Sequence, residues 1–291
     1  MPVVNRRNLR HNLGLRHLRD TITGNTTSSF GSVHVIDRAL ADTTFTAEML
    51  HYRSWARFFP TGSANGVDFR VASFNCASGA LISLALDGTT VPSGAGYEVA
   101  AALSPADKDR CLDLVLGVVR VRREVGIQTT EGLTHYPLDG VASPHYLFPD
   151  QILDCFYYAD PSHSLNRAPC AFDTWEVERT ATGHELRVSP ALGASQQIVL
   201  DGILSLTLGA AEVATINIPD EEWVLLGAEA HAWNLLMKRG PAQETKQYAD
   251  LRRDAAFAFS KKSQMFQPRV TRPLPELEEP GFLVGDDSEA F

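Results

Sequence analysis

The sequence predicts an α+β fold in which helices pack together and two β-rich modules are inserted between them. Three observations predict this. Apolar residues recur at helical spacing near both ends of the chain and once in its middle. Short alternating runs bounded by turn residues fill the two intervals, as in a small barrel or sandwich. The last residues are acidic and rich in proline, which predicts an extended arm instead of another element.

The N-terminal segment is predicted to be a helix over residues 5–24, because Leu9, Leu13 and Leu18 recur at helical steps with arginines between them. A small polar linker follows over residues 25–32. The first domain is therefore placed at residues 1–29.

Residues 30–103 are predicted to form an inserted small β-barrel. Short strands are expected near residues 32–37, 53–59, 67–74, 80–86 and 97–99. They are separated by turns, including a hairpin at Asn65-Gly66, where both residues tolerate a positive φ.

A helix of the bundle is predicted next, in a unit covering residues 104–126. Ser104 is a good N-cap and Pro105 suits the first helical position. The helix is expected to run to about residue 124 and to end at Gly126.

A second β module is predicted over residues 127–215, with strong strands at 151–158, 174–179 and 184–189 and a split near Asp201-Gly202. A C-terminal helical hairpin follows over residues 216–266. Pro219 opens it, and Trp223 is predicted to be a core residue whose loss would destabilise the fold strongly. Residues 267–291 form the extended acidic arm.

Composition excludes some classes of function. Apolar residues make up 44% and charged residues 21% of the chain, and no apolar run is long enough for a membrane span. The basic N-terminus lacks the continuous apolar segment of a secretion signal. The net charge of −9 argues against tight, general binding of nucleic acid. The four cysteines (76, 111, 155 and 170) are scattered, which predicts reduced thiols and no zinc site.

The sequence carries none of the common catalytic motifs. The sequence contains no P-loop, dinucleotide fingerprint, HExxH or GxSxG pattern. Three histidines (135, 145 and 163) lie near four aspartates (139, 150, 154 and 160), but no metal-ligand spacing links them, so they are interpreted as polar residues of loops and strand edges. No catalytic, cofactor-binding or metal-ligating residue is assigned, and no enzymatic activity is predicted.

Several segments together carry a resemblance to a known family. They are Leu186–Pro190, Ile216–Trp223 and Leu225–Ala230, together with the N-terminal helix, the turn at 62–66 followed by residues 69–71, and Tyr97–Val99. This arrangement resembles the head-to-tail adaptor proteins of tailed bacteriophages, also called head-completion or neck connector proteins, in a longer variety that carries an inserted β-barrel.

The resemblance implies a structural virion protein, made in the host cytoplasm and located in the neck. Such adaptors form a homo-oligomeric ring, usually dodecameric, beneath the portal protein and join the capsid to stopper or tail proteins. DNA passes through the lumen during genome packaging and ejection, without a cofactor or a membrane. The C-terminal extension commonly reaches the portal, which makes these residues candidates for docking: Arg269, Arg272, Leu274, Leu277, Phe282, Leu283 and Phe291.

Two alternatives remain open. The chain could be another neck component, a stopper or tail terminator, although its helical hairpin favours an adaptor. It could also be a carbohydrate-binding β protein in which Trp55, Trp175 and Tyr157 form a sugar platform. An exposed aromatic row with carboxylates beside it would support the second alternative.

Overall fold

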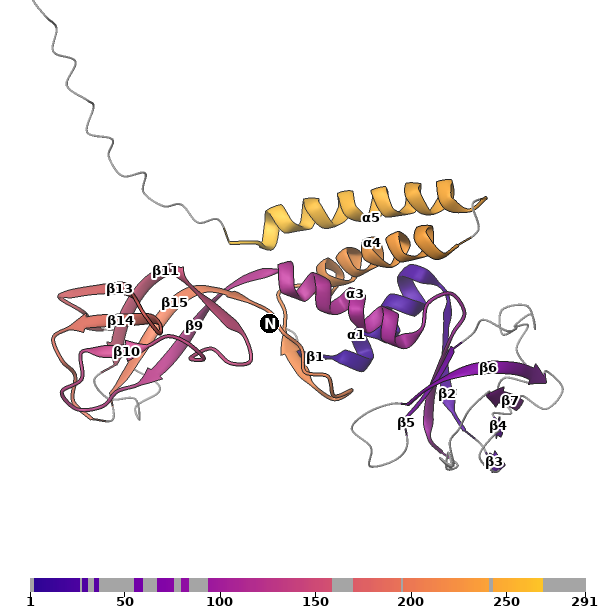
Figure 1. Ribbon diagram of the computed structural model, residues 1–291, viewed down its shortest axis with the longest axis horizontal. Coiled ribbons are helices and arrows are strands. Elements are labelled where there is room, and N and C mark those ends of the chain that lie inside the picture. Colours follow the sequence, from indigo (N-terminus) through magenta and orange to yellow (C-terminus); the bar gives the residue numbers. More distant parts are fainter. Residues whose placement is uncertain are drawn as a thin grey trace, which may run out of the picture.

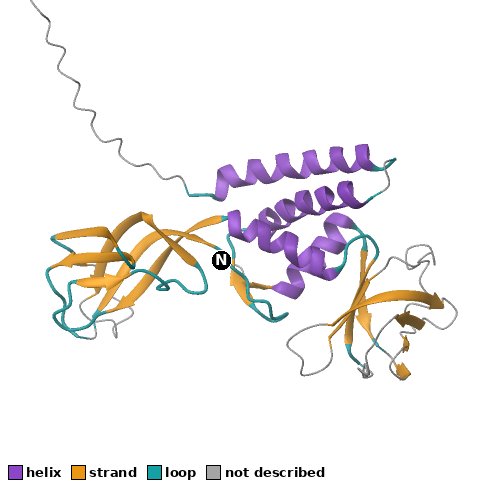
Figure 2. Cartoon of the chain, viewed as in Figure 1, coloured by secondary structure: helices purple, strands orange, loops and turns teal. Residues whose placement is uncertain are grey.

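The computed structural model describes residues 3–26, 28–30, 34–36, 55–59, 67–75, 80–83, 94–158, 170–194, 196–240 and 243–268. Helices occupy the middle of the molecule and a β module lies on either side of them (Figure 1). Figure 2 shows the same division by secondary structure. The described residues thus form a mixed α+β fold with four helices and four antiparallel sheets.

The N-terminal helix is shorter than the sequence predicts. After strand β1 (Val3–Asn5), helix α1 (Arg6–Asn12) continues as the π-helical segment η1 (Leu13–Leu18). Arg19 then adopts a left-handed conformation with φ 53°, which ends the helix. Thr21–Asn25 forms strand β2 and pairs with β8, so the prediction of helix to residue 24 was wrong there. The β-branched Thr-Ile-Thr sequence favours this strand.

The first β module is a seven-stranded antiparallel sheet in the order β2-β8-β5-β6-β7-β4-β3. Its further strands are β3 (Ser28–Phe30), β4 (His34–Ile36), β5 (Trp55–Phe59), β6 (Val67–Asn75), β7 (Ala80–Ser83) and β8 (Gly96–Ala100). The strands predicted between residues 32 and 99 are confirmed where they are described. Residues 28–30, predicted to lie in a linker, instead form β3.

The prediction of a closed barrel was wrong for this sheet, because its end strands β2 and β3 do not pair with each other among the described residues. Closure would bring these two consecutive strands together. Instead the Thr26 amide donates to the Ala95 carbonyl at 2.9 Å, and the Gly94 amide donates to the Thr26 carbonyl at 2.7 Å. These bonds extend the pairing of β2 with β8 by one residue, to Thr26 and the segment that precedes β8.

Helix α3 (Pro105–Val118) begins as predicted. Ser104 is its N-cap, and the Ser104 hydroxyl accepts a hydrogen bond from the Asp107 amide at 3.1 Å. The helix ends six residues before the predicted position, and Arg120–Gln128 forms strand β9. From Val121 onward the less exposed residues alternate with exposed ones, and every residue of β9 pairs with β15. The valine-rich run therefore follows the period of a strand.

The second β module consists of a four-stranded sheet, ordered β12-β11-β15-β9, and a three-stranded sheet, ordered β10-β14-β13. Its strands are β10 (His135–Pro137), β11 (Tyr146–Tyr158), β12 (Cys170–Ala171), β13 (Thr174–Thr180), β14 (Gly183–Ser189) and β15 (Gln197–Ser205). The split predicted near Asp201-Gly202 is absent from β15, whose ladder to β9 is continuous. The irregularity lies in β11, where the register to β15 shifts on both sides of Ile152.

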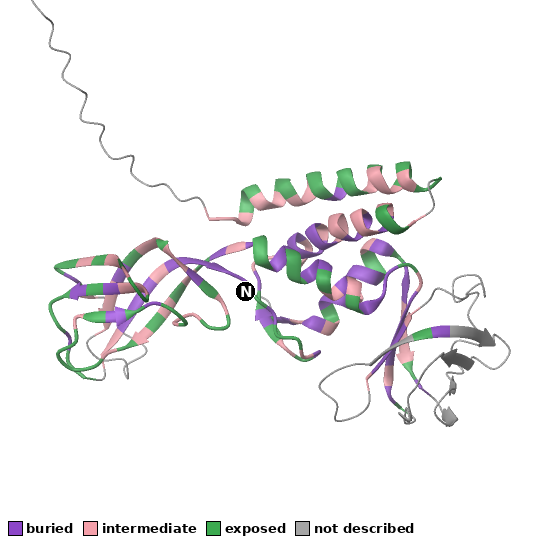
Figure 3. Cartoon of the chain, viewed as in Figure 1, coloured by how far each residue is buried: buried purple, intermediate pink, exposed green. Residues whose placement is uncertain are grey.

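The C-terminal hairpin consists of α4 (Glu221–Arg239) and α5 (Thr245–Phe266), which pack along each other. Pro219 precedes α4 and Asp220 caps it, because the Asp220 carboxylate accepts from the Trp223 amide at 3.2 Å. Just before this hairpin, β16 (Thr215–Asn217) pairs with β1, which joins the two ends of the helical region. Helix α4 contacts α1, η1 and α3 as well as α5, and its residues are among the most buried in Figure 3.

Among the described residues, no helix has the length and apolar character that crossing a membrane would require. The described cysteines Cys111, Cys155 and Cys170 are free thiols, and Cys76 lies outside the described residues.

Candidate functional site

The seven predicted docking residues, from Arg269 to Phe291, lie outside the described residues. The last described residue is Pro268, two residues after the end of α5. The assignment of these residues to portal docking therefore stays a prediction. Most of the buried ion pairs that the structure defines lie in the helical region and at its junction with the first β module.

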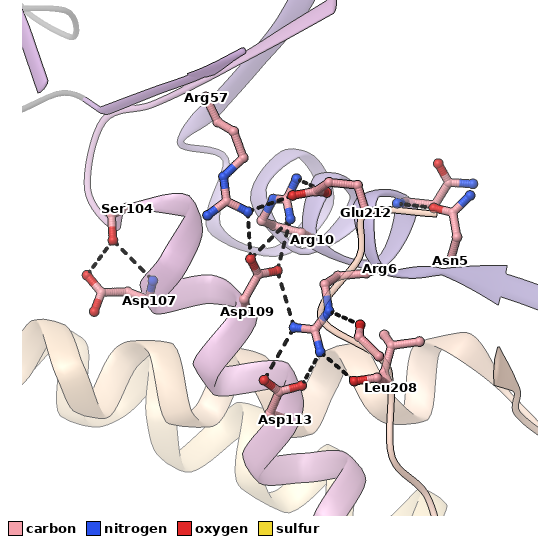
Figure 4. A network of polar contacts seen from close by, with 12 residues as sticks. Asn5, Arg6, Arg10, Arg57, Ser104, Asp107, Asp109, Asp113, Leu208 and Glu212 are labelled. Carbon is pink, nitrogen blue, oxygen red and sulfur yellow. Dashed lines mark hydrogen bonds and ion pairs between the residues drawn. The ribbon is translucent and has the colours of Figure 1, made fainter. Parts of the chain in front are cut away.

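The largest of these is a central cluster of three arginines and four carboxylates, drawn in part in Figure 4. Its members are Arg6, Arg10, Arg57, Glu98, Asp109, Asp113 and Glu212. Arg10 lies at its middle and is fully buried. The Arg10 guanidinium donates to Glu98 at 2.9 Å, Asp109 at 2.9 Å and Glu212 at 2.7 Å. One side chain of α1 thus joins β8, α3 and the segment before β16.

The other two arginines extend the same junction. Arg57 of β5 donates to Asp109 at 2.7 Å and to Glu212 at 2.8 Å. Arg6 donates to Asp113 at 2.6 Å and to the carbonyl of Leu208 at 2.8 Å. The seven-stranded sheet is therefore tied to α1 and α3 by charged hydrogen bonds with defined directions, which restrict how the sheet is oriented on the helices.

The chemistry of the central cluster suits orientation better than proton transfer. Burial opposes the charge of Arg10, but the carboxylates of Glu98, Asp109 and Glu212 outweigh it and raise the arginine pKa further above its ordinary value. A guanidinium that stays protonated cannot act as a base. We therefore interpret the cluster as a fixed structural junction. Sequence reasoning missed it, although two arginines one helical turn apart on the same face as Leu9 and Leu13 were a usable signal.

A second buried ion pair lies nearby. The ammonium of Lys108 in α3 is fully buried and donates to the Asp20 carboxylate at 2.7 Å and to the Thr21 hydroxyl. Gly14 of η1 makes room for this contact, because a Cβ there would lie 2.0 Å from the Thr21 hydroxyl oxygen. The pair fastens the end of η1 and the start of β2 to α3.

His17 of η1 forms the contact with α4. Its Nδ1 lies 2.8 Å from the Glu229 carboxylate, which also accepts a hydrogen bond from the Trp233 indole at 3.0 Å. Glu222 lies 3.5 Å from the other ring nitrogen. Burial lowers the His17 pKa, but the hydrogen bond to Glu229 and the charges of both glutamates outweigh it, so the net pKa is raised. Protonation of His17 therefore strengthens the contact between η1 and α4.

The hairpin itself is held by aromatic packing, as predicted for Trp223. This side chain is fully buried and stacks against Phe259 and Phe266 of α5, and its indole donates to the Ser263 hydroxyl at 2.8 Å. Within the chain, Lys262 pairs with Asp220 at 2.7 Å.

The histidines and aspartates near residue 150 are not brought together as a metal site. Among the residues that the structure describes, no group of three or more His, Cys, Asp or Glu side chains could hold a metal ion. The His145 Nδ1 accepts from the Thr207 amide at 3.2 Å, and His135 contacts Thr134. His163 and Asp160 lie outside the described residues.

The proposed sugar platform is also not assembled in the described chain. Trp55 lies in β5 of the seven-stranded sheet, whereas Tyr157 and Trp175 lie in β11 and β13 of the second β module. Tyr157 and Trp175 are half-buried and pack against the hydrophobic core. The three aromatic side chains therefore do not form one exposed row.

In comparisons with known proteins, no protein family, curated protein or solved structure matches the chain.

Proposed function

We propose that this protein is a head-to-tail adaptor of a tailed bacteriophage. It forms a ring beneath the portal protein in the virion neck, joins the capsid to stopper or tail proteins, and surrounds the passing DNA. The observation that supports this most is the architecture: the helices gather in the middle of the molecule, and the two β modules extend from them in opposite directions (Figure 1). In a ring, the helices supply contacts between subunits and the β modules extend toward other neck components.

The central cluster supports a role in assembly. A ring subunit must hold its projecting modules at one angle, because a small error in orientation accumulates around a closed ring. The cluster joins β5 and β8 of the first module to α1 and α3 through arginine–carboxylate bonds, which are specific in direction as well as favourable.

The arm at residues 267–291 supplies the proposed contact with the portal. Residues 268–291 include four prolines and six acids, a composition that does not sustain a helix or bury a core of its own. Binding a partner through such a segment adds interface without a new domain. Ring symmetry then multiplies each weak contact into a stable attachment.

Deletion of the arm tests this proposal. The full-length chain should co-sediment with purified portal rings of the same phage, whereas a chain ending at Pro268 should keep the circular dichroism spectrum and melting temperature of the full-length protein and bind roughly tenfold or more weakly. Leu133→Ser changes an exposed residue of the second β module and serves as a control with unchanged binding. Equal portal binding by the truncated chain would remove the docking role of the arm. A full-length chain that ignores portal rings and is absent from virions would contradict the adaptor proposal.

A further inference from the structure

His17 lies between two carboxylates of a neighbouring helix, and its side chain is only 8% exposed. It belongs to η1, a π-helical segment, and such segments are rare and frequently occur at functional sites. Its Nδ1 lies 2.8 Å from the Glu229 carboxylate and its Nε2 lies 3.5 Å from the Glu222 carboxylate. Both glutamates belong to α4, and their spacing of about two turns places them on the same side of that helix.

The two ring nitrogens of His17 differ in how well they are paired. Nδ1 makes the hydrogen bond to Glu229, whereas Nε2 is buried and has no hydrogen-bond partner among the described residues. Burial raises the pKa of Glu229, but hydrogen bonds from His17 and Trp233 outweigh it, so its net pKa is lowered and it stays ionised. An ionised carboxylate only accepts, so a neutral His17 carries its single proton on Nδ1. Its Nε2 is then a bare acceptor that faces the acceptor oxygens of Glu222.

A second proton on the ring removes this conflict. It turns Nε2 into a donor, so that each nitrogen of the imidazolium faces a carboxylate. Buried polar atoms of folded proteins are nearly always paired, which favours the protonated ring at this position. Burial lowers the His17 pKa, yet the two glutamates raise it by more, in agreement with the geometry.

The other charged groups around η1 are engaged elsewhere or exposed to solvent. On η1 and just after it, Arg16 and Arg19 are exposed. Strand β2 contains no charged residue, and Asp20 before it pairs with Lys108 of α3. Four titratable groups of α1 have other neighbours: Arg6 and Arg10 in the central cluster, Arg7 over the Phe59 ring, and His11 near Glu98. Two further groups of α4 also have other neighbours: Glu221 accepts from Asn12, and His231 lies near Arg252.

The contact of His17 reaches α5 through Glu229. The other oxygen of Glu229 accepts from the Trp233 indole at 3.0 Å. The Trp233 ring stacks on Tyr248 of α5, with ring centroids 5.7 Å apart and planes inclined by 18°. Helix α4 lies between α5 and the other helices (Figure 1), so the attachment of α4 to η1 also positions α5.

We propose that His17, Glu222 and Glu229 form a proton-operated clamp that holds the α4–α5 hairpin on the N-terminal helical segment. The clamp is closed when both nitrogens of His17 carry a proton. It loosens as the pH rises and Nε2 loses its proton, because a bare nitrogen then faces Glu222 and the positive charge that attracts both glutamates is gone. This inference goes beyond the proposed function and does not depend on it, since every contact of the clamp lies within one chain.

Nuclear magnetic resonance of the full-length protein, with heavy nitrogen in its histidine rings, reports the protons on each ring nitrogen. The His17 signals are identified by their loss in His17→Gln. His17 should titrate with a pKa above about 6.5 and pass from a ring protonated on both nitrogens to one protonated on Nδ1 alone. Glu222→Gln should lower this pKa, because it removes the negative charge that faces Nε2. Glu222 is 43% exposed, so this change leaves the core untouched.

Glu221→Gln is the matched control. Glu221 lies next to Glu222 in the first turn of α4 but contacts Asn12, and glutamine keeps an acceptor oxygen for that contact. This variant should leave the His17 pKa nearly unchanged.

Hydrogen exchange followed by mass spectrometry measures the loosening itself. Each observed rate is divided by the intrinsic rate at the same pH, so that the protection of the amides can be compared. Protection of η1 and α4 should fall by roughly threefold or more between about pH 6 and about pH 8.5, whereas that of β13 and β14 should stay constant. The fall should be smaller in Glu222→Gln and should persist in Glu221→Gln.

Three results would overturn the clamp. One is a His17 ring that keeps a single proton from about pH 5 to about pH 9. Another is a His17 pKa that Glu222→Gln leaves unchanged, which would show that Nε2 does not use this carboxylate. The third is protection of η1 and α4 that does not depend on pH, which would show that other contacts hold the hairpin. Because these measurements involve neither portal rings nor self-association, such a failure would leave the adaptor proposal in place.

Discussion

Replacing Arg10 by methionine removes the charge at the middle of the central cluster while keeping much of the side chain volume. Arg10 is fully buried and donates hydrogen bonds to three carboxylates. Asp109 and Glu212 keep Arg57 as a partner after the change. Glu98 loses its described salt bridge and remains buried.

The expected loss of folding free energy comes mainly from Glu98, the one carboxylate left without its partner. Removing one partner of a buried ion pair leaves an uncompensated charge and typically costs about 3–5 kcal/mol of folding free energy. Removing both partners is less harmful, because no unpaired charge remains. Arg10→Met should therefore destabilise the protein by about 3 kcal/mol or more. The double variant Arg10→Met/Glu98→Gln should recover at least about 1 kcal/mol of that loss.

Urea unfolding followed by far-ultraviolet circular dichroism measures both values. Arg187→Met is the matched control, since Arg187 forms exposed contacts with Glu176 and Glu178 at 3.3 Å and 3.2 Å. Its loss should cost less than about 1 kcal/mol. If Arg10→Met is no more destabilising than Arg187→Met, the cluster does not hold the sheet on the helices and the reasoning is refuted.

Three further outcomes are expected. Trp223→Ala should cost about 3 kcal/mol or more by leaving a cavity between α4 and α5, and a melting curve equal to that of the wild type would contradict this. The raised pKa of His17 means that its pair with Glu229 stabilises fully below about pH 6.5 and loses this effect as the pH rises through the folded pKa. The free energy of unfolding, measured by urea titration, should therefore differ more between wild type and His17→Gln near pH 6 than near pH 8.5. A difference that does not change with pH would exclude this linkage. Gly14→Ala should destabilise by about 1–3 kcal/mol, because the new Cβ meets Thr21, and thermal unfolding that is unchanged would show that Thr21 can move away.

Local signals in the sequence predicted most of the elements. The N-cap at Ser104, the proline before α4 and the alternating runs of the second β module each have a short-range physical cause, and the structure contains the elements they predict. Trp223 was placed in the core by its spacing, which the buried side chain confirms. The adaptor function stays a proposal, since it came from a resemblance of arrangement.

The errors arose where two local patterns compete. Residues 119–125 contain enough valine to extend a helical face, yet the same valines also fit a strand, and pairing with β15 decides the outcome. Residues 21–24 were assigned to a helix, although they belong to strand β2, which pairs with β8. Closure of the first sheet would require its end strands β2 and β3 to pair with each other, and the local strand and turn signals do not specify which strands pair.

The partners of Arg10 in the central cluster could not be predicted from the sequence for a different reason. The carboxylates that meet Arg10 lie 88, 99 and 202 positions further along the chain. No spacing rule connects residues so far apart. The two arginines on the apolar face of α1, Arg6 and Arg10, were the local sign that buried partners existed.

Electron microscopy of the virion neck, at a resolution that separates subunits, tests the adaptor proposal most directly. The account predicts a ring of this chain between the portal and the tail, with residues 269–291 on the portal. A neck that contains no copy of this chain, or one that places it away from the portal, would contradict the account.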